Sequence, residues 1–272
     1  MAAVRAGSVK RVTSTANPVV KAVRALHQRK ARAESGLFLA EGHKLVLDAL
    51  AAGWPPTMIV ALEPGDGPVA DLAARVRAAG ADVVFANAMV MEKLARRDNP
   101  QTVLGVFEQR VVLPSALRPG TIVVLEEPRD PGNVGTIVRT ADAIGAAGVV
   151  LVGASADPFG VEAVRATMGS IFHVPLARTD AAGFEAYAAR FDGAVVGTHL
   201  AASLDVRDLE PREPQLLVMG TEQSGLSDRL AAACTSLVRI PMAGRADSYN
   251  LAVATALALY ELRRPLLAGA KA

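Results

Sequence analysis

Residues Asp130 to Thr140 place polar side chains around a glycine-containing turn between an apolar run and a helical pattern. Asn133 and Arg139 carry amide and guanidinium groups, which donate hydrogen bonds to phosphate and hydroxyl oxygens. Thr121 to Leu125 supplies the incoming strand, and Val149 to Val152 supplies the next one. Because ligands of such units gather at the carboxyl ends of the strands, this segment is a candidate ligand site.

The glycines of this segment would suit a phosphate-binding turn of a dinucleotide-binding fold. Gly132 and Gly135 give only GxxG, whereas that fold requires GxGxxG. A nucleotide-dependent enzyme therefore stays open as one reading of this segment alone, and other segments must decide.

A second polar segment runs from Val218 to Ser227 and again follows an apolar run into a glycine turn. Glu222 is expected at the carboxyl end of that strand. A serine-hydrolase elbow is disfavoured, because Glu222 occupies the first glycine position that GxSxG requires before Ser224. Ser227 can cap the helix that follows.

A third segment runs from Ile240 to Asn250 and leads into a predicted helix from about Leu251 to Leu262. Ser248 and Asn250 can cap this helix or serve a polar site. The helix is apolar around almost its whole surface until Glu261, so we expect it to be covered on both sides. This pattern favours a homodimer.

The composition allows two α/β domains. The chain has 272 residues, of which 51% are hydrophobic. Residues 1–108 alternate short helices and strands, beginning with a helix expected from Asn17 to about Ala33. A proline-containing linker is expected at 109–120, and a second domain at 121–272. Its strands are apolar on both faces, which is typical of a mostly parallel sheet covered by helices.

Several classes of function are disfavoured by the composition. Cys234 is the only cysteine, so no intrachain disulfide and no thiolate metal cluster can form. The four histidines lack metal-ligand spacing, and we expect no metal. No apolar run approaches the roughly 20 residues that span a bilayer, and no signal peptide is evident. We therefore expect a cytoplasmic protein without a membrane segment.

The net charge of +2 hides an uneven distribution. Eight Lys and Arg residues lie between positions 5 and 32, before the first acid, Glu34. This basic segment indicates either a polyanionic partner or an ordinary solvated helix face, and charge alone leaves both open.

The three polar segments, in this order, resemble the SpoU/TrmH family of RNA ribose 2′-O-methyltransferases within the SPOUT class. The first matches DPxNxGxIxRT, the second GxExxGLS, and the third IPMxGxxxSxN before a helix that ends in Tyr-Glu. The resemblance spans about Thr121 to Arg264. Residues 1–108 resemble a small RNA-recruiting domain related to a ribosomal-protein fold. Tyr249 departs from the family, which usually has leucine there.

The resemblance implies a deep trefoil knot, although connection rules alone would reject one. It also implies a homodimer whose active site is built across both subunits, and S-adenosylmethionine as the cofactor. The residues implied to hold the cofactor are Thr198, Gly220, Ile240, Met242 and Tyr249. No metal is required.

Arg139 is the implied catalytic residue, with Asn133, Glu222, Ser248 and Asn250 completing the polar pocket. Glu222 is expected to pair with Arg139 or Asn133. Arg139 acts either as a base or as a clamp on the neighbouring phosphate, and both readings stay open; guanidinium is nearly always protonated. RNA would be recruited by the basic segment, through Lys21, Arg24, Arg29, Lys30 and Arg32.

The expected reaction is methylation of a ribose 2′-hydroxyl in structured RNA, with 23S rRNA favoured. The alternatives are a tRNA 2′-O-methyltransferase and a non-catalytic, ribosome-associated RNA-binding protein. The scarcity of aromatic residues favours an RNA recognised by shape over one recognised by base stacking.

Overall fold

The structure is a computed structural model that describes residues 6–64, 66–95 and 101–267. It divides into two compact units, Met1–Gln109 with Phe159–Phe172, and Arg110–Pro158 with His173–Ala272. The domain boundaries expected from the sequence, at 108 and 121, stay a prediction. In the described part of the chain, no helix has the length and apolar character needed to cross a membrane.

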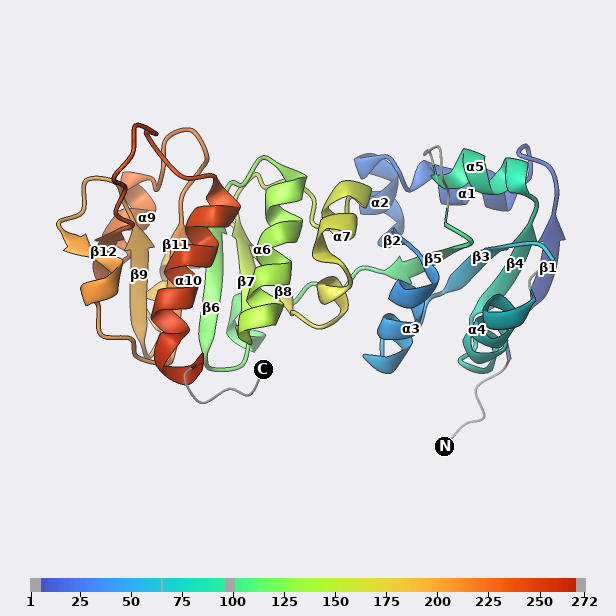
Figure 1. Ribbon diagram of the computed structural model, residues 1–272, viewed down its shortest axis with the longest axis horizontal. Helices are drawn as coiled ribbons and strands as arrows, with labels where there is room; N and C mark the ends of the chain where they lie inside the picture. Colours follow the sequence, from blue (N-terminus) through green and yellow to red (C-terminus); the bar gives the residue numbers. More distant parts are fainter. Residues whose placement is uncertain (1–5, 65, 96–100, 268–272) are drawn as a thin grey trace. The chain divides into compact units, whose positions relative to one another are not determined.

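The first unit contains a mixed five-stranded sheet (Figure 1). Its strands, in spatial order, are β1 (Val9–Val12), β4 (Asp82–Ala86), β3 (Met58–Leu62), β5 (Val103–Glu108) and β2 (Leu37–Glu41). The first three are parallel, whereas β5 is antiparallel to both of its neighbours. The helices are α1 (Pro18–Ala25), α2 (Arg29–Ser35), α3 (His43–Ala51), α4 (Gly67–Ala78), α5 (Ala88–Ala95) and α7 (Val161–Thr167).

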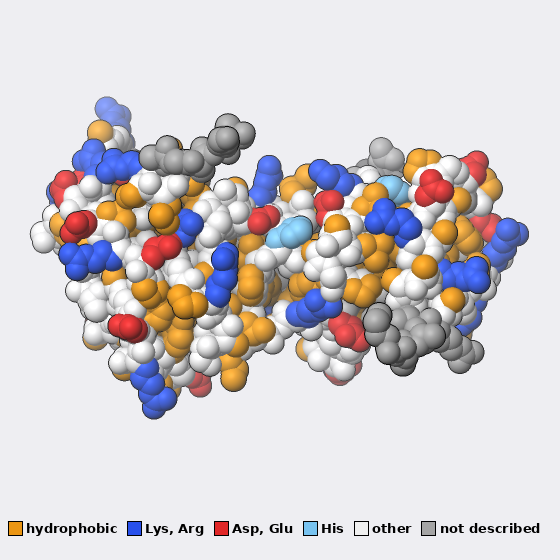
Figure 2. Space-filling view, turned by 90° about the horizontal axis from the view of Figure 1, so that it is seen from below, with side chains coloured by type: hydrophobic (Ala, Val, Ile, Leu, Met, Phe, Trp, Pro, Cys, Tyr) orange, Lys and Arg blue, Asp and Glu red, His pale blue; other side chains and the backbone are white. Residues whose placement is uncertain are grey.

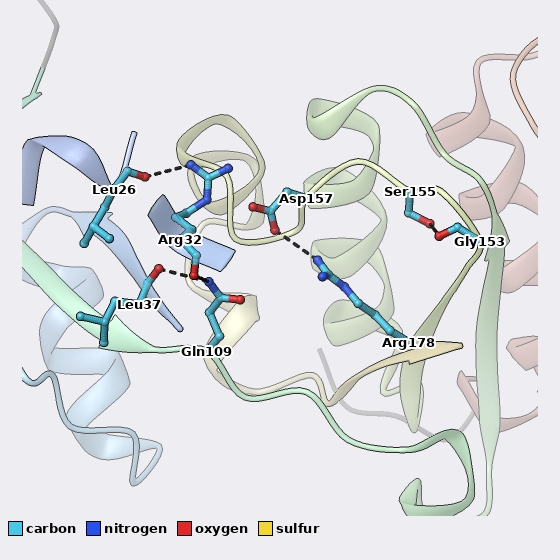
Figure 3. Close-up of polar contacts among 8 residues, drawn as sticks. All are labelled: Leu26, Arg32, Leu37, Gln109, Gly153, Ser155, Asp157 and Arg178. Carbon is cyan, nitrogen blue, oxygen red and sulfur yellow. Dashed lines mark hydrogen bonds and ion pairs between the residues drawn. The ribbon is translucent and has the colours of Figure 1, made fainter. Parts of the chain in front are cut away.

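The single helix expected from Asn17 to Ala33 is wrong, because α1 ends at Ala25 and α2 begins at Arg29. The start is as expected, with Asn17 Oδ1 accepting from Val19 N at 2.9 Å before Pro18. The interruption has a tertiary cause. Arg32 Nη1 donates to Leu26 O at 2.9 Å, so this carbonyl has a side-chain partner where the helix would otherwise continue (Figure 3).

Strand β1 was not expected from the sequence. It lies at the edge of the sheet, and its first three residues are exposed. Lys10 and Arg11 therefore point away from any apolar core, and the alternation typical of a half-buried strand is missing. Edge strands commonly carry such charges.

Residues Phe159–Phe172 belong to the first unit although they lie far from it in sequence. Phe159 and Phe172 contact Phe38, with ring centroids 5.0 and 6.2 Å apart. Helix α7 adds an ion pair, since Arg165 Nη2 lies 2.7 and 2.8 Å from the two carboxylate oxygens of Glu41. The Glu41 side chain is only 3% exposed, so this segment completes the core of the unit.

Replacing Arg165 with methionine is expected to destabilise the first unit by about 2 kcal/mol, because the Glu41 carboxylate loses its guanidinium partner in a buried setting. The figure lies below that of a fully buried pair, since the Arg165 side chain is 42% exposed. Urea unfolding of the full chain measures it. Lys30→Met is the matched control, because its 3.8 Å contact with Glu34 is solvent-exposed and should change stability by less than about 0.5 kcal/mol. Equal effects of the two changes would contradict the prediction.

The second unit is built on a seven-stranded sheet in which all the described strand pairs are parallel. The spatial order is β10 (Leu204–Asp205), β12 (Ser236–Arg239), β9 (Ala194–Thr198), β11 (Gln215–Met219), β6 (Thr121–Glu126), β7 (Gly148–Val152) and β8 (Leu176–Thr179). The expected mostly parallel α/β fold is confirmed. The knot stays a prediction.

Helices cover both faces of this sheet. Helices α6 (Pro131–Ile144) and α10 (Leu251–Leu267) lie side by side on one face (Figure 1). Helices α8 (Ala181–Ala188) and α9 (Asp228–Ala232) contribute Phe184 and Leu230 to the core on the other face. The edge strand β8 is tied to the loop after β7 by Arg178, whose Nη2 lies 3.2 Å from Asp157 Oδ1 (Figure 3).

Candidate functional site

The carboxyl ends of β9, β11 and β12 open into one cavity of about 560 Å³. Its lining includes all five residues expected to hold the cofactor: Thr198, Gly220, Ile240, Met242 and Tyr249. Glu222, Ser248 and Asn250 line the same cavity. Apolar side chains, among them Met219, Leu226 and Leu251, form part of its wall, which suits an uncharged ring and an aliphatic chain.

The wall after β11 is a tight hairpin from Thr221 to Gly225. Thr221 N donates to Gly225 O at 2.9 Å, and Gly225 N donates back to Thr221 O at 3.1 Å. Gly225 has a φ of +71°, which favours glycine. Gly220 lies under this hairpin, where a Cβ atom would be 1.9 Å from Leu226 N. The hairpin can pack this closely on the end of β11 only because Gly220 has no side chain.

A chain of hydrogen bonds joins the three polar segments. Asn133 Nδ2 donates to Glu222 Oε1 at 3.3 Å, and Asn250 Nδ2 donates to Asn133 Oδ1 at 3.0 Å. Asn250 Oδ1 accepts from Ala252 N at 2.9 Å at the start of α10. Since an ionised carboxylate only accepts and a backbone N–H only donates, both amides are held in one orientation.

Glu222 therefore pairs with Asn133, which is one of the two partners expected. It also accepts from the backbone N–H of Arg129 at 3.3 Å and of Asp130 at 3.4 Å. These donors at the start of α6 stabilise a negative charge. Asp130 itself caps the helix through Asn133 N at 2.7 Å, so Asn133 is not the capping side chain.

Two residues of this region were missed from the sequence. Arg129 Nη1 donates to Gln223 Oε1 at 2.9 Å, and this bond joins the loop before α6 to the hairpin after β11. Glu126, at the end of β6, accepts from Ser227 N at 2.9 Å and from its hydroxyl, while Ser227 caps α9 as expected. In the sequence, the pair of acids Glu126 and Glu127 shortly before the first polar segment was the signal that could have pointed to Glu126.

Arg139 lies apart from this network. It is exposed on α6, six residues after Asn133, which corresponds to about 120° around the helix and about 9 Å along it. In the part of the chain that the structure describes, its guanidinium has no hydrogen bond or ion pair. Glu222 is thus not paired with Arg139 within this chain.

Ser248 and Tyr249 are exposed at the rim of the cavity. Tyr249 donates its hydroxyl proton to Pro241 O at 3.2 Å, and its side chain is 40% exposed. The family usually has leucine at this position. Here the tyrosine joins the two ends of the third polar segment, Ile240 to Asn250, through its hydrogen bond to Pro241 O. The described residues contain no group of three or more His, Cys, Asp or Glu that could bind a metal ion.

The basic residues expected to contact RNA do not all lie on the surface. Lys21, Arg24, Arg29 and Lys30 are exposed on or beside α1 and α2. Arg32 is only 5% exposed and is used to bond Leu26 O, so its inclusion among the RNA-facing residues is corrected. The sequence could not distinguish it from its neighbours because it shares their charge and helical context.

With this geometry in place, comparison with known families decides the assignment. The profile of the SpoU rRNA Methylase family matches residues 120–260. The chain belongs to the SpoU family. A second profile, that of the MRM3-like substrate binding domain, matches residues 17–105. The predicted family and the predicted recruiting domain before it are confirmed.

Relatives of this SpoU methylase share both parts. An AdoMet-bound rRNA methyltransferase from Sinorhizobium meliloti is 49% identical, with a TM-score of 0.90 over 95% of this chain and 99% of that one. A 23S rRNA (uridine(2479)-2′-O)-methyltransferase from Streptomyces viridochromogenes is 33% identical over 90% of this chain and 88% of its own length. The 23S rRNA (guanosine(2553)-2′-O)-methyltransferase RlmP of Bacillus subtilis is 29% identical over 94% and 100%.

The cysteine of this SpoU methylase is expected to be unreactive. Burial, with a smaller contribution from the Glu126 carboxylate, raises the pKa of the Cys234 thiol to about 12. Its sulfur also donates to Leu230 O at 3.3 Å. At pH 8 the thiolate is therefore scarce, and iodoacetamide should leave the native protein unlabelled for hours. Mass spectrometry checks this, with urea-unfolded protein as the control that should label within minutes; rapid native labelling would contradict it.

Proposed function

We propose that this chain transfers a methyl group from S-adenosylmethionine to a ribose 2′-hydroxyl of 23S rRNA. One observation carries the proposal: Gly220, Ile240 and Tyr249 line a single cavity whose rim holds the Glu222, Asn133 and Asn250 network. The names of the relatives support the reaction and the RNA. We expect the reaction to take place in the cytoplasm.

The cavity fits this cofactor. Met219, Leu226 and Leu251 offer apolar surface, and Gly220 lies in the same wall. When bound, S-adenosylmethionine supplies an electrophilic methyl group on a sulfonium. Its charge is compatible with a lining whose acids are Glu222 and Asp247.

The polar network positions the acceptor. Asn133 and Asn250 each use one amide proton in the network and keep a second one for a ribose oxygen. Because Glu222 fixes Asn133, and α10 fixes Asn250, these donors need little reorganisation when the ribose arrives. Ser248, at the same rim, can add a hydroxyl partner.

Arg139 binds the phosphate next to the reacting ribose in this proposal, and the phosphate helps to accept the hydroxyl proton. A guanidinium forms paired hydrogen bonds to phosphate oxygens and rarely loses its own proton. The residue acts after dimerisation, so that the Arg139 that completes one site comes from the other protomer.

The proposed homodimer forms through α6 and α10. The outer face of α10 exposes Val253, Leu257 and Tyr260 at 48%, 41% and 55%. The spacing of four and three residues places these side chains on one stripe. Helix α10 itself packs against α6, the helix that carries Arg139.

The first unit recruits the RNA through Lys21, Arg24, Arg29 and Lys30, which can neutralise backbone phosphates. The match of residues 17–105 to a substrate-binding domain supports this role. Binding through these residues should weaken steeply as salt is raised.

Mapping 2′-O-methyl groups in total RNA tests the function. Cells without the gene should lose methylation at one ribose of 23S rRNA, and the intact gene should restore it whereas an Arg139→Ala copy should not. Loss of methylation at a tRNA position instead would show that tRNA, and not 23S rRNA, is the substrate. Loss of no site would overturn methyl transfer and leave an RNA-binding protein.

A further inference from the structure

A second cavity, of about 730 Å³, lies in the second unit and reaches the amino ends of two strands of its sheet. Pro119 and Pro214 line it, and each lies just before the start of a strand, β6 or β11. Because these strands are parallel, Pro119 and Pro214 place one end of the cavity at their amino ends, whereas the methyl-transfer site is at their carboxyl ends; Thr179, the last residue of β8, lines the other end of the cavity. The length of β6, about 20 Å, separates Pro119 from the carboxyl end of that strand. The methyl-transfer mechanism uses no residue of this second cavity.

The wall formed by α8 and the turn after it is aromatic. The rings of Tyr187 and Phe191 have centroids 5.7 Å apart and an interplanar angle of 59°, and both side chains are half-buried. Burial raises the pKa of Tyr187, so its hydroxyl stays protonated and can donate. Both belong to the small aromatic content of this protein, 4% of its residues.

The mouth of the cavity is basic. Arg118 and Arg190 both line it and are exposed. Within the described residues, neither guanidinium has an ion pair or a hydrogen bond, whereas Arg178, Arg207, Arg212 and Arg229 of the same unit are paired. Among the described residues of the lining, Asp192 is the one acid, which leaves an excess positive charge. Figure 2 looks at the molecule from below, and its left half shows hydrophobic side chains with both basic and acidic side chains among them.

We propose that this cavity binds one nucleotide of a single-stranded segment of the substrate RNA, with the base against Tyr187 and Phe191 and phosphates on Arg118 and Arg190. The inference rests on the proposed function for the identity of the RNA. An aromatic pair provides a stacking surface that accepts any base, and two unpaired guanidiniums suit a backbone that continues beyond the cavity. The segment lies far enough from the reacting ribose to set register without entering the methyl-transfer site.

Crosslinking tests the position of the RNA. The full-length protein is irradiated with a 12-nucleotide oligouridylate that contains 4-thiouridine, and the crosslinked peptides are identified by mass spectrometry. Crosslinks to Tyr187, Phe191 or the residues between them are expected. Crosslinks confined to the first unit would overturn the proposal.

Binding of the same oligonucleotide, measured by fluorescence anisotropy over a range of salt concentrations, tests the contacts. Arg118→Glu and Arg190→Glu should each raise Kd about tenfold. Each should also reduce the slope of log Kd against log salt concentration by roughly one, the value for one released counterion. Arg212→Glu is the matched control, since this exposed arginine pairs with Glu210 and lines neither cavity, and it should change Kd less than about twofold. Tyr187→Ala should raise Kd about tenfold at unchanged salt dependence, while Tyr187→Phe should bind normally.

The outcomes separate this inference from the proposed function. If the wild type methylates rRNA but Arg118→Glu and Arg190→Glu bind like Arg212→Glu, the cavity is not an RNA site and the enzyme assignment stands. If the wild type methylates no RNA yet crosslinks at Tyr187, the reaction fails and the site stands. A change in sedimentation of the two arginine variants, with no change in Kd, would assign the cavity to contact between copies of the chain and overturn the proposal.

Discussion

Replacing Gly220 with alanine is expected to weaken S-adenosylmethionine binding strongly, because the added methyl group has no space. A Cβ atom there would lie 1.9 Å from Leu226 N and 2.0 Å from Gly225 C, both of them backbone atoms that cannot rotate away. The hairpin from Thr221 to Gly225 would have to shift and deform the cavity wall. A cost of about 3 kcal/mol raises Kd more than a hundredfold. Isothermal titration calorimetry measures this change directly.

Gly244→Ala is the matched control for this prediction. Gly244 lies in the third polar segment, and a Cβ atom at its position would meet nothing within 4 Å. Its Kd should stay within about twofold of the wild type, and circular dichroism should show both variants folded. A Gly220→Ala protein that is folded and binds the cofactor normally would remove this cavity as the cofactor site.

The sequence predicted the second unit well because its elements obey local rules. Asn133 and Glu222 can be grouped from the sequence alone, since their segments follow strands of one parallel sheet, and such strands end at the same edge. Asn250 joined them through the resemblance to the family. The motifs then supply their order. Gly220 was named through the resemblance to the family.

The first unit was predicted less well because tertiary contacts decide its details. The break between α1 and α2 depends on Arg32 reaching Leu26 O, and on His27 Nε2 meeting Leu94 O at 2.6 Å. Neither contact leaves a pattern in the local sequence. The same applies to Phe159 and Arg165, whose partners Phe38 and Glu41 lie more than a hundred positions earlier.

The second cavity was invisible in the sequence for a related reason. Tyr187 and Phe191 resemble ordinary core residues of an amphipathic helix, and Arg118 resembles an ordinary linker charge. Only the fold brings the linker against α8. A site without a motif is found from unpaired charge beside open apolar surface, and both properties arise only when the chain folds.

Arg139→Ala is expected to reduce methyl transfer by about a thousandfold while S-adenosylmethionine binding changes less than about twofold. Arg139 does not line the cofactor cavity, and its exposed guanidinium is free to meet an RNA phosphate. Single-turnover transfer of a labelled methyl group to 23S rRNA measures the first effect, and calorimetry the second. Arg212→Ala should leave both unchanged. Turnover near the wild-type rate in Arg139→Ala would remove this residue from the mechanism.

Arg139→Lys then separates the two chemical roles, because a lysine ammonium titrates near pH 10.4 whereas guanidinium does not titrate in this range. A phosphate clamp needs the charged form, so the residual rate of Arg139→Lys should be constant from pH 7 to about pH 9.5 and fall above it. A base needs the neutral form, so the rate would rise about tenfold for each pH unit over the same range. We expect the constant profile, since the position is exposed to solvent.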